Sequence, residues 1–405
     1  MRTRYGQSPW VRQFPESRRP DFPRARGDAS VDVVIVGGGI TGCAIAQAAA
    51  AARLDTILLE ADRIGQASAG RSPGLLSTDP GPAFRDVATA HGLRSARRVF
   101  DSWRRGAVEG AALLRRLKIR CALEPRDAVV LADRVSEKLL RREFDARVEA
   151  GHGVAWLSPR QLAKQVRLDA PAAMRARDGF TLDPYRACVG LAAAARARGA
   201  RLFERSPARK IRFTPKYAEV TTAGGVIQAK TVVIATGSAG IEFKPLRRHF
   251  KARESYVALT EPVPAAVRRQ LGDESIILSR AATPALTLRW GGDERLVVSG
   301  APQDETPGRT RKAVLVQRTG YLMYEALKMY PAISGLQPEY GWEASYGETA
   351  DGLMYIGAHR NYPRHLFALG GHAESITGAF VAARIVTRAL QGQSDKADEV
   401  FGWAR

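Results

Sequence analysis

The sequence predicts a mixed α/β fold, in which a domain built on a parallel sheet is interrupted by a second, α+β domain built on an antiparallel sheet. Three observations support this prediction. A buried strand, a glycine turn and an alanine-rich helix follow one another near the start; further apolar strands end in small residues; and residues 242–342 alternate strand-like runs with proline-containing links. At 405 residues the chain is also too long for one ordinary domain.

The first element is the segment VDVVIVGGGITG. Its apolar run ends in glycines, and Gly37, Gly39 and Gly42 have the G-x-G-x-x-G spacing. The first glycine permits a sharp turn, the second lets a pyrophosphate approach the backbone, and the third lets helix and strand pack closely. The next strand, TILL, ends in Glu60, where an acid that binds an adenosine ribose belongs. These features predict a dinucleotide site, with helix N–H groups facing the phosphates.

The remaining elements follow from periodicity and turn residues. Residues 1–30 form a basic, proline-rich extension that we expect to lie across the surface, with Trp10 and Phe14 as anchors. We expect helices at 84–118, from Ser158-Pro159, 183–198, 310–329 and 376–390. We expect strands at 128–131, 201–204, 218–222, 226–229, 231–234, 255–260, 275–278, 285–290, 295–299 and 366–369. The Gly224-Gly225 pair predicts a hairpin turn.

These elements divide the chain into discontinuous domains. After the extension, the predicted nucleotide-binding domain comprises residues 31–118, 183–242 and 343–392, the second domain comprises 119–182 and 243–342, and 393–405 form a C-terminal tail.

The charge balance is unusual, since 62 Lys and Arg against 41 Asp and Glu give a net charge of +21. Such a surplus suits an RNA or membrane partner. The arginine clusters, however, recur at helical spacing among alanines and leucines, with few aromatic residues to stack on bases, so solvated helix faces are favoured and a nucleic-acid partner is not.

Several other classes of protein find no support. Cys43, Cys121 and Cys188 are widely spaced without a C-x-x-C pair, which argues against a disulfide framework or a zinc site and suits a reducing, cytoplasmic setting. His359 and His365 are expected in loops rather than as ligands, so no metal site is predicted. No secretory signal and no uncharged apolar stretch long enough to span a membrane is present.

Taken together, the residues from 31 onward resemble the FAD-dependent oxidoreductases of the D-amino-acid oxidase (DAO) class, which includes glycine oxidase, sarcosine oxidase and γ-glutamylputrescine oxidase. The resemblance rests on the order and spacing of DVVIVGGGITG, TILLEAD, ASAGRSPG, LDPYRACVGLAAAARARGARL, KTVVIATGSAG, ESYVALTEP, ERLVVSGAP and DGLMYIG…LFALGG. It implies a Rossmann-like FAD-binding domain interrupted by an antiparallel-sheet substrate domain.

The resemblance also implies which residues contact FAD. For the AMP half these are Gly37, Gly39, Ile40, Thr41, Gly42, Glu60, Ala61 and Arg63, with Ala208 pairing its backbone with adenine. Beside the flavin they are Arg71, Ser72 and Gly74, then Thr236 and Gly237 behind the ribityl chain, and Ile376 and Thr377 at the start of the last helix, whose dipole would stabilise reduced flavin. For Ser72 and Ala208 a purely structural role stays equally open.

Departures from the family pattern bear on the substrate. Tyr346 stands where amino-acid-oxidising relatives hold the substrate carboxylate with an arginine, and the tail reads Ala-Glu-Ser where amine-oxidising relatives have Gly-His-Gly. Without a carboxylate clamp, an amine fits better than an amino acid. We expect Glu343 or Glu374 to attract the cationic amine and Tyr346 or Tyr256 to orient it, although both glutamates could equally be structural.

The expected reaction is oxidation of a C–N bond by hydride transfer to flavin N5, giving an imine that water hydrolyses. The tail lacks the cysteine that attaches flavin in monomeric sarcosine oxidase, so FAD is expected to be noncovalent. Val297, Val298 and Pro302 supply no charge near the flavin, which leaves either O2 or another carrier as electron acceptor. Two alternatives stay open: an RNA-modifying FAD oxidoreductase, and a flavin-binding protein without turnover of its own.

Overall fold

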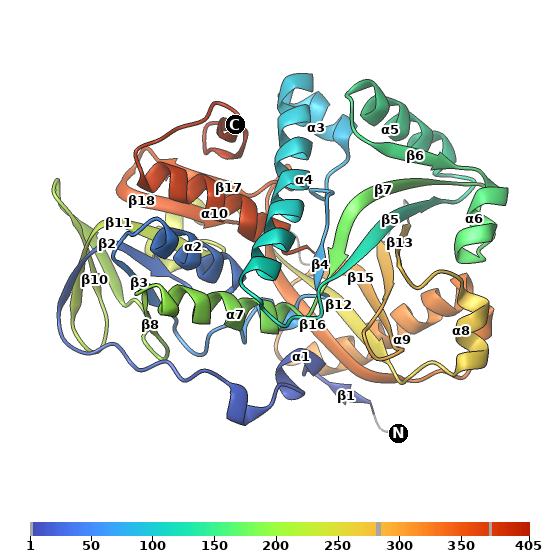
Figure 1. Ribbon diagram of the computed structural model, residues 1–405, viewed down its shortest axis with the longest axis horizontal. Helices are drawn as coiled ribbons and strands as arrows, with labels where there is room; N and C mark the ends of the chain where they lie inside the picture. The colour runs from blue at the N-terminus through green and yellow to red at the C-terminus, as the bar shows by residue number, and fades with distance from the viewer. Residues whose placement is uncertain (1–2, 281–284, 372–374) are drawn as a thin grey trace.

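Two β-sheets form the framework of the molecule, and each carries its own helices (Figure 1). The computed structural model describes residues 3–280, 285–371 and 375–405. The long helix α4 (Leu93–Arg116) stands between the two parts, with α3 (Phe84–His91) beside its N-terminal end. This arrangement confirms the predicted mixed α/β fold, although the predicted helix at 84–118 is two helices separated at Gly92.

The sheet that contains β2, called the β2 sheet below, is mainly parallel. Its strands, in spatial order, are β17 (Tyr355–His359), β18 (Tyr362–Leu369), β11 (Val226–Gly237), β2 (Ala29–Val36), β3 (Thr56–Leu59) and β8 (Arg201–Phe203). In addition, β10 (Ala218–Thr221) pairs with β11, and β9 (Lys210–Phe213) pairs with β10. β11 is one strand where two were predicted. Lys230 breaks its apolar pattern but points to solvent, where it pairs with Asp32 of β2 at 2.8 Å.

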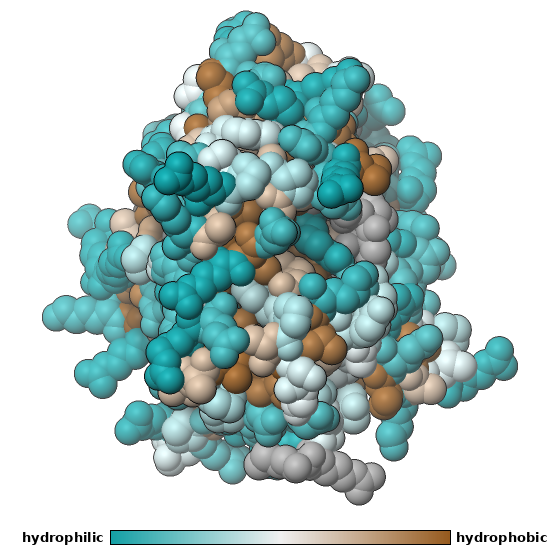
Figure 2. Space-filling model, turned by 90° about the vertical axis from the view of Figure 1, so that its right-hand side faces the viewer, coloured by the Kyte–Doolittle hydropathy of each residue, from teal (hydrophilic) through white to brown (hydrophobic). Residues whose placement is uncertain are grey.

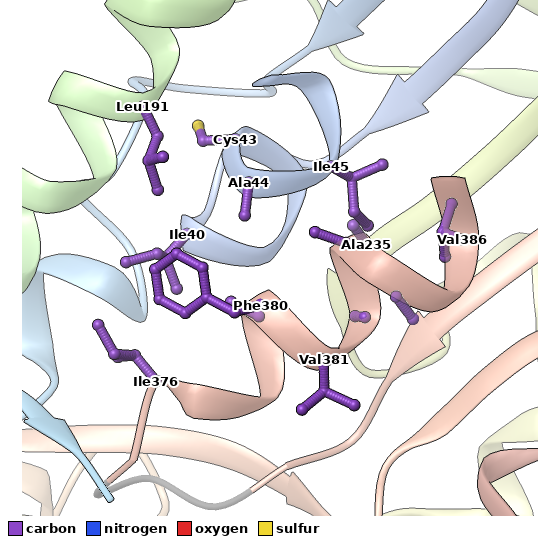
Figure 3. Packing of buried hydrophobic residues seen from close by; sticks show 14 of the residues in the cluster. Ile40, Cys43, Ala44, Ile45, Leu191, Ala235, Ile376, Phe380, Val381 and Val386 are labelled. Atoms are coloured by element: carbon purple, nitrogen blue, oxygen red, sulfur yellow. The ribbon is translucent and has the colours of Figure 1, made fainter. Parts of the chain in front are cut away.

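Three helices cover one face of the β2 sheet: α2 (Ile40–Ala51), α7 (Pro184–Ala197) and α10 (Thr377–Leu390). Figure 3 shows α2 between the other two, with Leu191 of α7 on one side and Phe380 and Val381 of α10 on the other. The small residues Cys43 and Ala44 face this core, and both are fully buried. Small side chains on α2 therefore let both neighbouring helices approach closely.

The second sheet, called the β16 sheet, is largely antiparallel. Its strands, in order, are β1 (Arg4–Tyr5), β16 (Pro338–Glu348), β12 (Lys251–Thr260), β15 (Leu296–Asp304), β14 (Leu286–Trp290), β13 (Ile276–Arg280), β5 (Glu124–Ala132), β7 (Ala172–Thr181) and β4 (Leu75–Leu76), and β6 (Val154–Leu157) also pairs with β7. The pairings of β1 with β16 and of β13 with β5 are parallel, which the sequence pattern did not predict.

Helices α9 (Arg311–Met329), α8 (Ala265–Leu271) and α6 (Pro159–Val166) pack on one face of the β16 sheet, and α5 (Glu137–Glu149) packs near β6. The predicted helix starts are confirmed for α6 and α7. Ser158 forms a capping box with Gln161, and Asp183 accepts a hydrogen bond from the Arg186 backbone N–H at 2.9 Å. The domain boundaries stay predictions, and β16 runs without a break across the boundary proposed at residue 343.

The N-terminal residues lie along both parts of the molecule (Figure 1). β1 adds to the edge of the β16 sheet, and the short helix α1 (Pro9–Arg12) follows it. Trp10 packs edge-on against Trp342 of β16, with ring centroids 6.3 Å apart. Phe14 packs against Tyr185 of α7 at 5.3 Å. The two aromatic residues predicted as anchors therefore contact the β16 sheet and a helix of the β2 sheet, respectively.

The surface seen from the right-hand side of Figure 1 is mostly hydrophilic, and its apolar residues lie singly or in small groups (Figure 2). Within the described residues, no helix combines the length and apolar character needed to cross a membrane.

Candidate functional site

A cavity of about 330 Å³ lies at the carboxyl ends of β2, β3 and β11, and we call it the nucleotide cavity. Ligands of open parallel sheets bind at such ends. The sequence-predicted residues that line it are Gly37, Gly39, Ile40, Thr41, Glu60, Ala61, Ala208, Thr236 and Gly237. These predicted residues from four separate parts of the chain are thus brought together around one cavity.

In the glycine turn, residues 37–42, close backbone contacts at Gly37 and Gly42 leave no room for a side chain. Gly37 has a φ of +113°, which favours glycine. A Cβ on Gly42 would lie 1.9 Å from the Gly37 carbonyl oxygen, so helix and turn pack in direct contact. A Cβ on Gly39 would meet its nearest atom, Ser68 Oγ, only at 3.7 Å. Gly39 therefore leaves space on the cavity side, where a phosphate could approach the backbone.

Glu60 ties the glycine turn to the end of β3. One carboxylate oxygen accepts a hydrogen bond from the Gly38 N–H at 2.6 Å, and the other accepts one from the Asp62 N–H at 2.9 Å. The carboxylate is thereby fixed at the cavity wall. Arg63 is half-buried and is not among the lining residues, so its predicted role near the adenosine stays a prediction.

The predicted flavin-loop residues lie in the segment that follows the cavity. We call residues 68–74 the tethered loop, because side chains from other parts of the chain donate hydrogen bonds to its carbonyls. Ser68 lines the nucleotide cavity, whereas Arg71, Ser72 and Gly74 do not. Gly74 has a φ of +80°, and a Cβ there would lie 2.2 Å from the Leu182 carbonyl oxygen. The loop is thus packed tightly against the segment that precedes α7.

The tethered loop continues into β4, which meets the start of α10. The Ile376 N–H donates to the Leu75 carbonyl at 2.9 Å, and the Thr377 hydroxyl donates to the Ser77 carbonyl at 2.7 Å. The predicted residues at the start of α10 are therefore held beside the loop. Glu374 lies outside the described residues.

The β16 sheet separates the predicted catalytic residues by face, because successive side chains of a strand point to opposite faces. Trp342 packs with Val257 in the cluster that Trp10 covers. Tyr256 belongs to the opposite cluster, beneath α9. Its hydroxyl donates to Glu254 at 3.1 Å and accepts from Gln303 at 2.9 Å, and burial raises the pKa of Tyr256 to about 12. Tyr256 is therefore part of a buried polar network.

Glu343 of β16 is the register partner of Tyr256 on the neighbouring strand β12, so the two side chains lie on the same face of the sheet. Its Oε1 accepts from Arg71 Nη1 at 2.6 Å, while its Oε2 is buried without a hydrogen-bond partner among the described residues. Tyr346, by alternation, shares the face of Trp342 and is half-buried. The side chain of Arg253, its neighbour on β12, hydrogen-bonds to Tyr346 and lies 3.3 Å from a Glu348 carboxylate oxygen.

Sequence reasoning missed several residues of the cavity wall. These are Val36, Leu59, Ala67, Ser68, Pro207, Ile211, Ile234, Ala235, Gly240 and Phe243. Ala67 and Ser68 lie in the small-residue loop that the sequence singled out, so a signal for them existed. Phe243 carried none, because its place depends on how the chain turns after β11. Within the described parts of the chain, no group of three or more His, Cys, Asp and Glu side chains could hold a metal ion.

Comparisons with known proteins show which proteins this chain is similar to. The model of the family described as "FAD dependent oxidoreductase" (DAO) matches residues 32–389. γ-Glutamylputrescine oxidoreductase of Escherichia coli is 25% identical over 93% of this chain and 87% of its own length. Glycine oxidase of Bacillus licheniformis is 25% identical over 91% of this chain and 95% of its own.

Among solved structures, glycine oxidase from Geobacillus kaustophilus superposes with a TM-score of 0.75 and 20% identity, covering 93% of this chain and 99% of its own. L-Amino acid deaminase from Proteus myxofaciens gives a TM-score of 0.76 at 14% identity, covering 96% of each chain. These likenesses support the fold.

The residues of the nucleotide cavity fit FAD. The open space beside Gly39 suits a pyrophosphate, and α2 begins at that point, with Ile40 and Thr41 on the cavity wall. Glu60 supplies a carboxylate that can accept hydrogen bonds from ribose hydroxyls. Ala208, Pro207 and Ile211 provide a small apolar wall on which a flat base can lie.

Proposed function

Since this chain belongs to the FAD-dependent oxidoreductase family, we propose that it oxidises a C–N bond of a small amine or amino acid. The family match makes it an enzyme, an oxidoreductase whose cofactor is FAD. Two relatives that align over nearly the whole chain are named for nitrogen-containing substrates, γ-glutamylputrescine and glycine. This shared substrate chemistry supports a C–N donor.

The surroundings of Tyr346 favour an amine over an amino acid, and this observation carries the proposal. A carboxylate substrate needs an uncommitted cation, preferably an arginine that can bind it with two hydrogen bonds. Among the described residues, Arg253 is a cation that hydrogen-bonds to Tyr346, and it already pairs with Asp304 and Glu348. Its charge is therefore balanced by carboxylates of the protein.

The placement of the predicted residues sharpens their roles. Tyr346 shares the β16 face of Trp342, which contacts the tethered loop, so we propose that Tyr346 orients the substrate. The Tyr256 hydroxyl is committed to the network beneath α9. Glu343 is paired with Arg71, so Glu374 is the better candidate for attracting a cationic amine. These proposed roles concern the substrate, and FAD binding does not depend on them.

The chemistry requires the amine to lose its proton before oxidation, because the nitrogen lone pair assists loss of hydride from the adjacent carbon. Burial of the amine disfavours its charged form and so promotes this deprotonation. When bound, FAD supplies the two-electron acceptor. The substrate loses one hydride from carbon and one proton from nitrogen, and water then converts the imine to a carbonyl compound and a free amine.

We also infer that FAD is held noncovalently and that the enzyme works in the cytoplasm. All three cysteines are free and buried, and none lines the nucleotide cavity. Free thiols are typical of a reducing compartment. Denaturation should release all of the flavin into the supernatant, and flavin retained on the protein would contradict noncovalent binding.

The proposal is tested with FAD-loaded protein under anaerobic conditions. Mono- and diamines, N-methylated amines and amino acids are added in turn while the visible flavin absorbance is followed. We expect an amine to bleach the flavin, and admission of air then separates an oxidase from a dehydrogenase by the rate at which colour returns. Bleaching by hydroxy acids or polyol phosphates, with none by any amine or amino acid, would refute C–N oxidation.

Two matched substitutions test the residue assignment with the substrate so identified. Tyr346→Phe should lower kcat/KM about tenfold, since one hydrogen bond to substrate is lost. It should change the melting temperature little, because Arg253 keeps its ion pairs with Asp304 and Glu348 when its hydrogen bond to Tyr346 is lost. Tyr256→Phe removes a hydroxyl from a buried network and should lower the melting temperature with little effect on kcat/KM. The reverse pattern would assign orientation to Tyr256.

A further inference from the structure

The tethered loop is held by an unusual set of hydrogen bonds. Four consecutive backbone carbonyls, those of residues 70–73, each accept a hydrogen bond from a side chain remote in sequence. The pairs are Ser8 Oγ with Gly70 O, Trp342 Nε1 with Arg71 O at 2.7 Å, Trp10 Nε1 with Ser72 O at 3.0 Å, and Arg289 Nε with Pro73 O at 3.0 Å. Buried carbonyls are usually satisfied by backbone N–H groups of helices or sheets. Here side chains replace them.

The four donors come from two places. Trp342 and Arg289 belong to β16 and β14 of the β16 sheet, whereas Ser8 and Trp10 belong to the N-terminal segment, residues 3–14. The donors also touch one another: Trp10 packs on Trp342, and the Arg289 guanidinium lies 5.7 Å from the Trp10 ring centroid. Trp10, Trp342 and Arg289 therefore form one connected cluster beside the loop, and Ser8 precedes Trp10 by two residues.

Arg289 is a buried cation that donates hydrogen bonds to this loop. Its side chain is 4% exposed, and no carboxylate of the described residues lies within ion-pair distance of it. Burial, together with repulsion from Arg126, lowers the pKa of Arg289 to about 10. A buried guanidinium without a paired charge is costly, so its hydrogen bonds to carbonyls must compensate. Within the described residues, the remote carbonyl that it binds is Pro73 O.

The N-terminal segment is itself fixed at both ends. β1 pairs with the edge of β16, and the Gly6 N–H donates to the Gly341 carbonyl at 2.8 Å. Further on, Phe14 packs against Tyr185 of α7. The segment consequently crosses from the β16 sheet to the β2-sheet domain, with Ser8 and Trp10 placed where it passes over the loop. A β-strand added to a sheet edge gains affinity from backbone hydrogen bonds.

We propose that Ser8 and Trp10 are positioning residues of the FAD site, acting through the tethered loop. The loop borders the nucleotide cavity at Ser68 and leads to the start of α10. The donors hold the loop carbonyls away from the cavity, and this determines which side of the loop backbone faces the cofactor. Because Trp342 and Arg289 belong to the β16 sheet, the same hydrogen bonds join the loop to that sheet. The inference rests on FAD binding and not on the identity of the amine.

The test uses full-length, FAD-loaded protein and needs no substrate. Trp10→Phe keeps an aromatic ring and removes the N–H donor, and Ser8→Ala removes a hydroxyl. Phe14→Leu is the matched control, since it loosens the same segment without touching a loop carbonyl. The measurements are the FAD dissociation constant, the visible spectrum, the flavin reduction potential and the melting temperature of the apoprotein.

We expect the Ser8→Ala/Trp10→Phe double variant to bind FAD about tenfold more weakly, with a shifted flavin spectrum and potential, because two loop carbonyls lose their donors. The two single changes should be non-additive, since both act on one loop. Phe14→Leu should lower the apoprotein melting temperature while the FAD affinity and spectrum of the variant stay unchanged. If the double variant changes only the melting temperature, as the control does, the segment has no positioning role and the inference falls.

Discussion

The glycine turn and the tethered loop adjoin the same cavity, yet they are held in opposite ways. In the turn, the backbone packs on itself: a Cβ on Gly42 would strike the carbonyl of Gly37, five residues earlier. In the loop, successive carbonyls are held by side chains such as Trp10 and Trp342, the latter 271 residues from its partner Arg71.

This difference has a mechanical consequence. The turn tolerates no added atom at Gly37 or Gly42, because backbone carbonyl oxygens already fill that space, whereas Gly39 has room for one. A loop shaped by hydrogen bonds from elsewhere responds to changes in other parts of the chain, and each lost donor costs a moderate amount. One wall of the cavity therefore depends on glycines that lack side chains, and the adjoining loop depends on side chains that donate hydrogen bonds to its carbonyls.

The largest effect is expected in the turn. Gly42→Ala should abolish FAD binding and lower the free energy of unfolding by about 3 kcal/mol or more, because the methyl group cannot fit 1.9 Å from a carbonyl oxygen. Gly39→Ala is the control: its methyl has room, so the apoprotein should keep its melting temperature while FAD affinity falls. Calorimetry and FAD titration measure both quantities. Normal FAD binding by Gly42→Ala would show that the turn can relax.

A titratable group behind the tethered loop gives the next effect. Asp183 caps α7, and the adjacent Leu182 N–H donates to the Gly74 carbonyl at 3.0 Å. Burial raises the pKa of Asp183 from 3.8 to about 6, outweighing its hydrogen bonds and the charge of Arg186. The folded state therefore binds more protons than the unfolded state between about pH 4 and 6, so stability should fall as pH rises through that range, by roughly 3 kcal/mol at most.

Asp183→Asn keeps a capping oxygen and removes the titration. Unfolding in urea at a series of pH values should show the variant to be more stable than the parent near neutral pH, with the difference shrinking as the pH approaches 4. Parallel pH profiles for the two proteins would mean that Asp183 does not titrate in this way.

The smallest effect tests whether a side chain also supports the turn. Glu60→Gln should weaken FAD binding by about 1 kcal/mol, since the amide retains one acceptor oxygen in place of two charged ones. Glu204→Gln is the control, because Glu204 accepts from the Ile64 N–H at 2.9 Å without lining the cavity. That change should affect stability more than FAD affinity. Equal losses of FAD affinity would assign Glu60 a structural role.

Much of the fold could be predicted because the relevant forces are local. Glycine spacing, the capping residues Ser158 and Asp183, and the apolar run of β2 act within a few residues of themselves, and the structure places these elements as predicted. The resemblance to the DAO class, which the family match confirms, supplied the order in which these pieces assemble.

The sequence by itself determined the glycine turn and its neighbour Glu60 and, through the family resemblance, FAD as the cofactor. Only the tertiary structure decided that Tyr346 and Tyr256 point to opposite faces of the β16 sheet, and that Ser8 and Trp10 reach the loop at residues 70–73. The reason is physical: steric and capping preferences act between chain neighbours, whereas strand register and side-chain donors are fixed only when distant segments pack together.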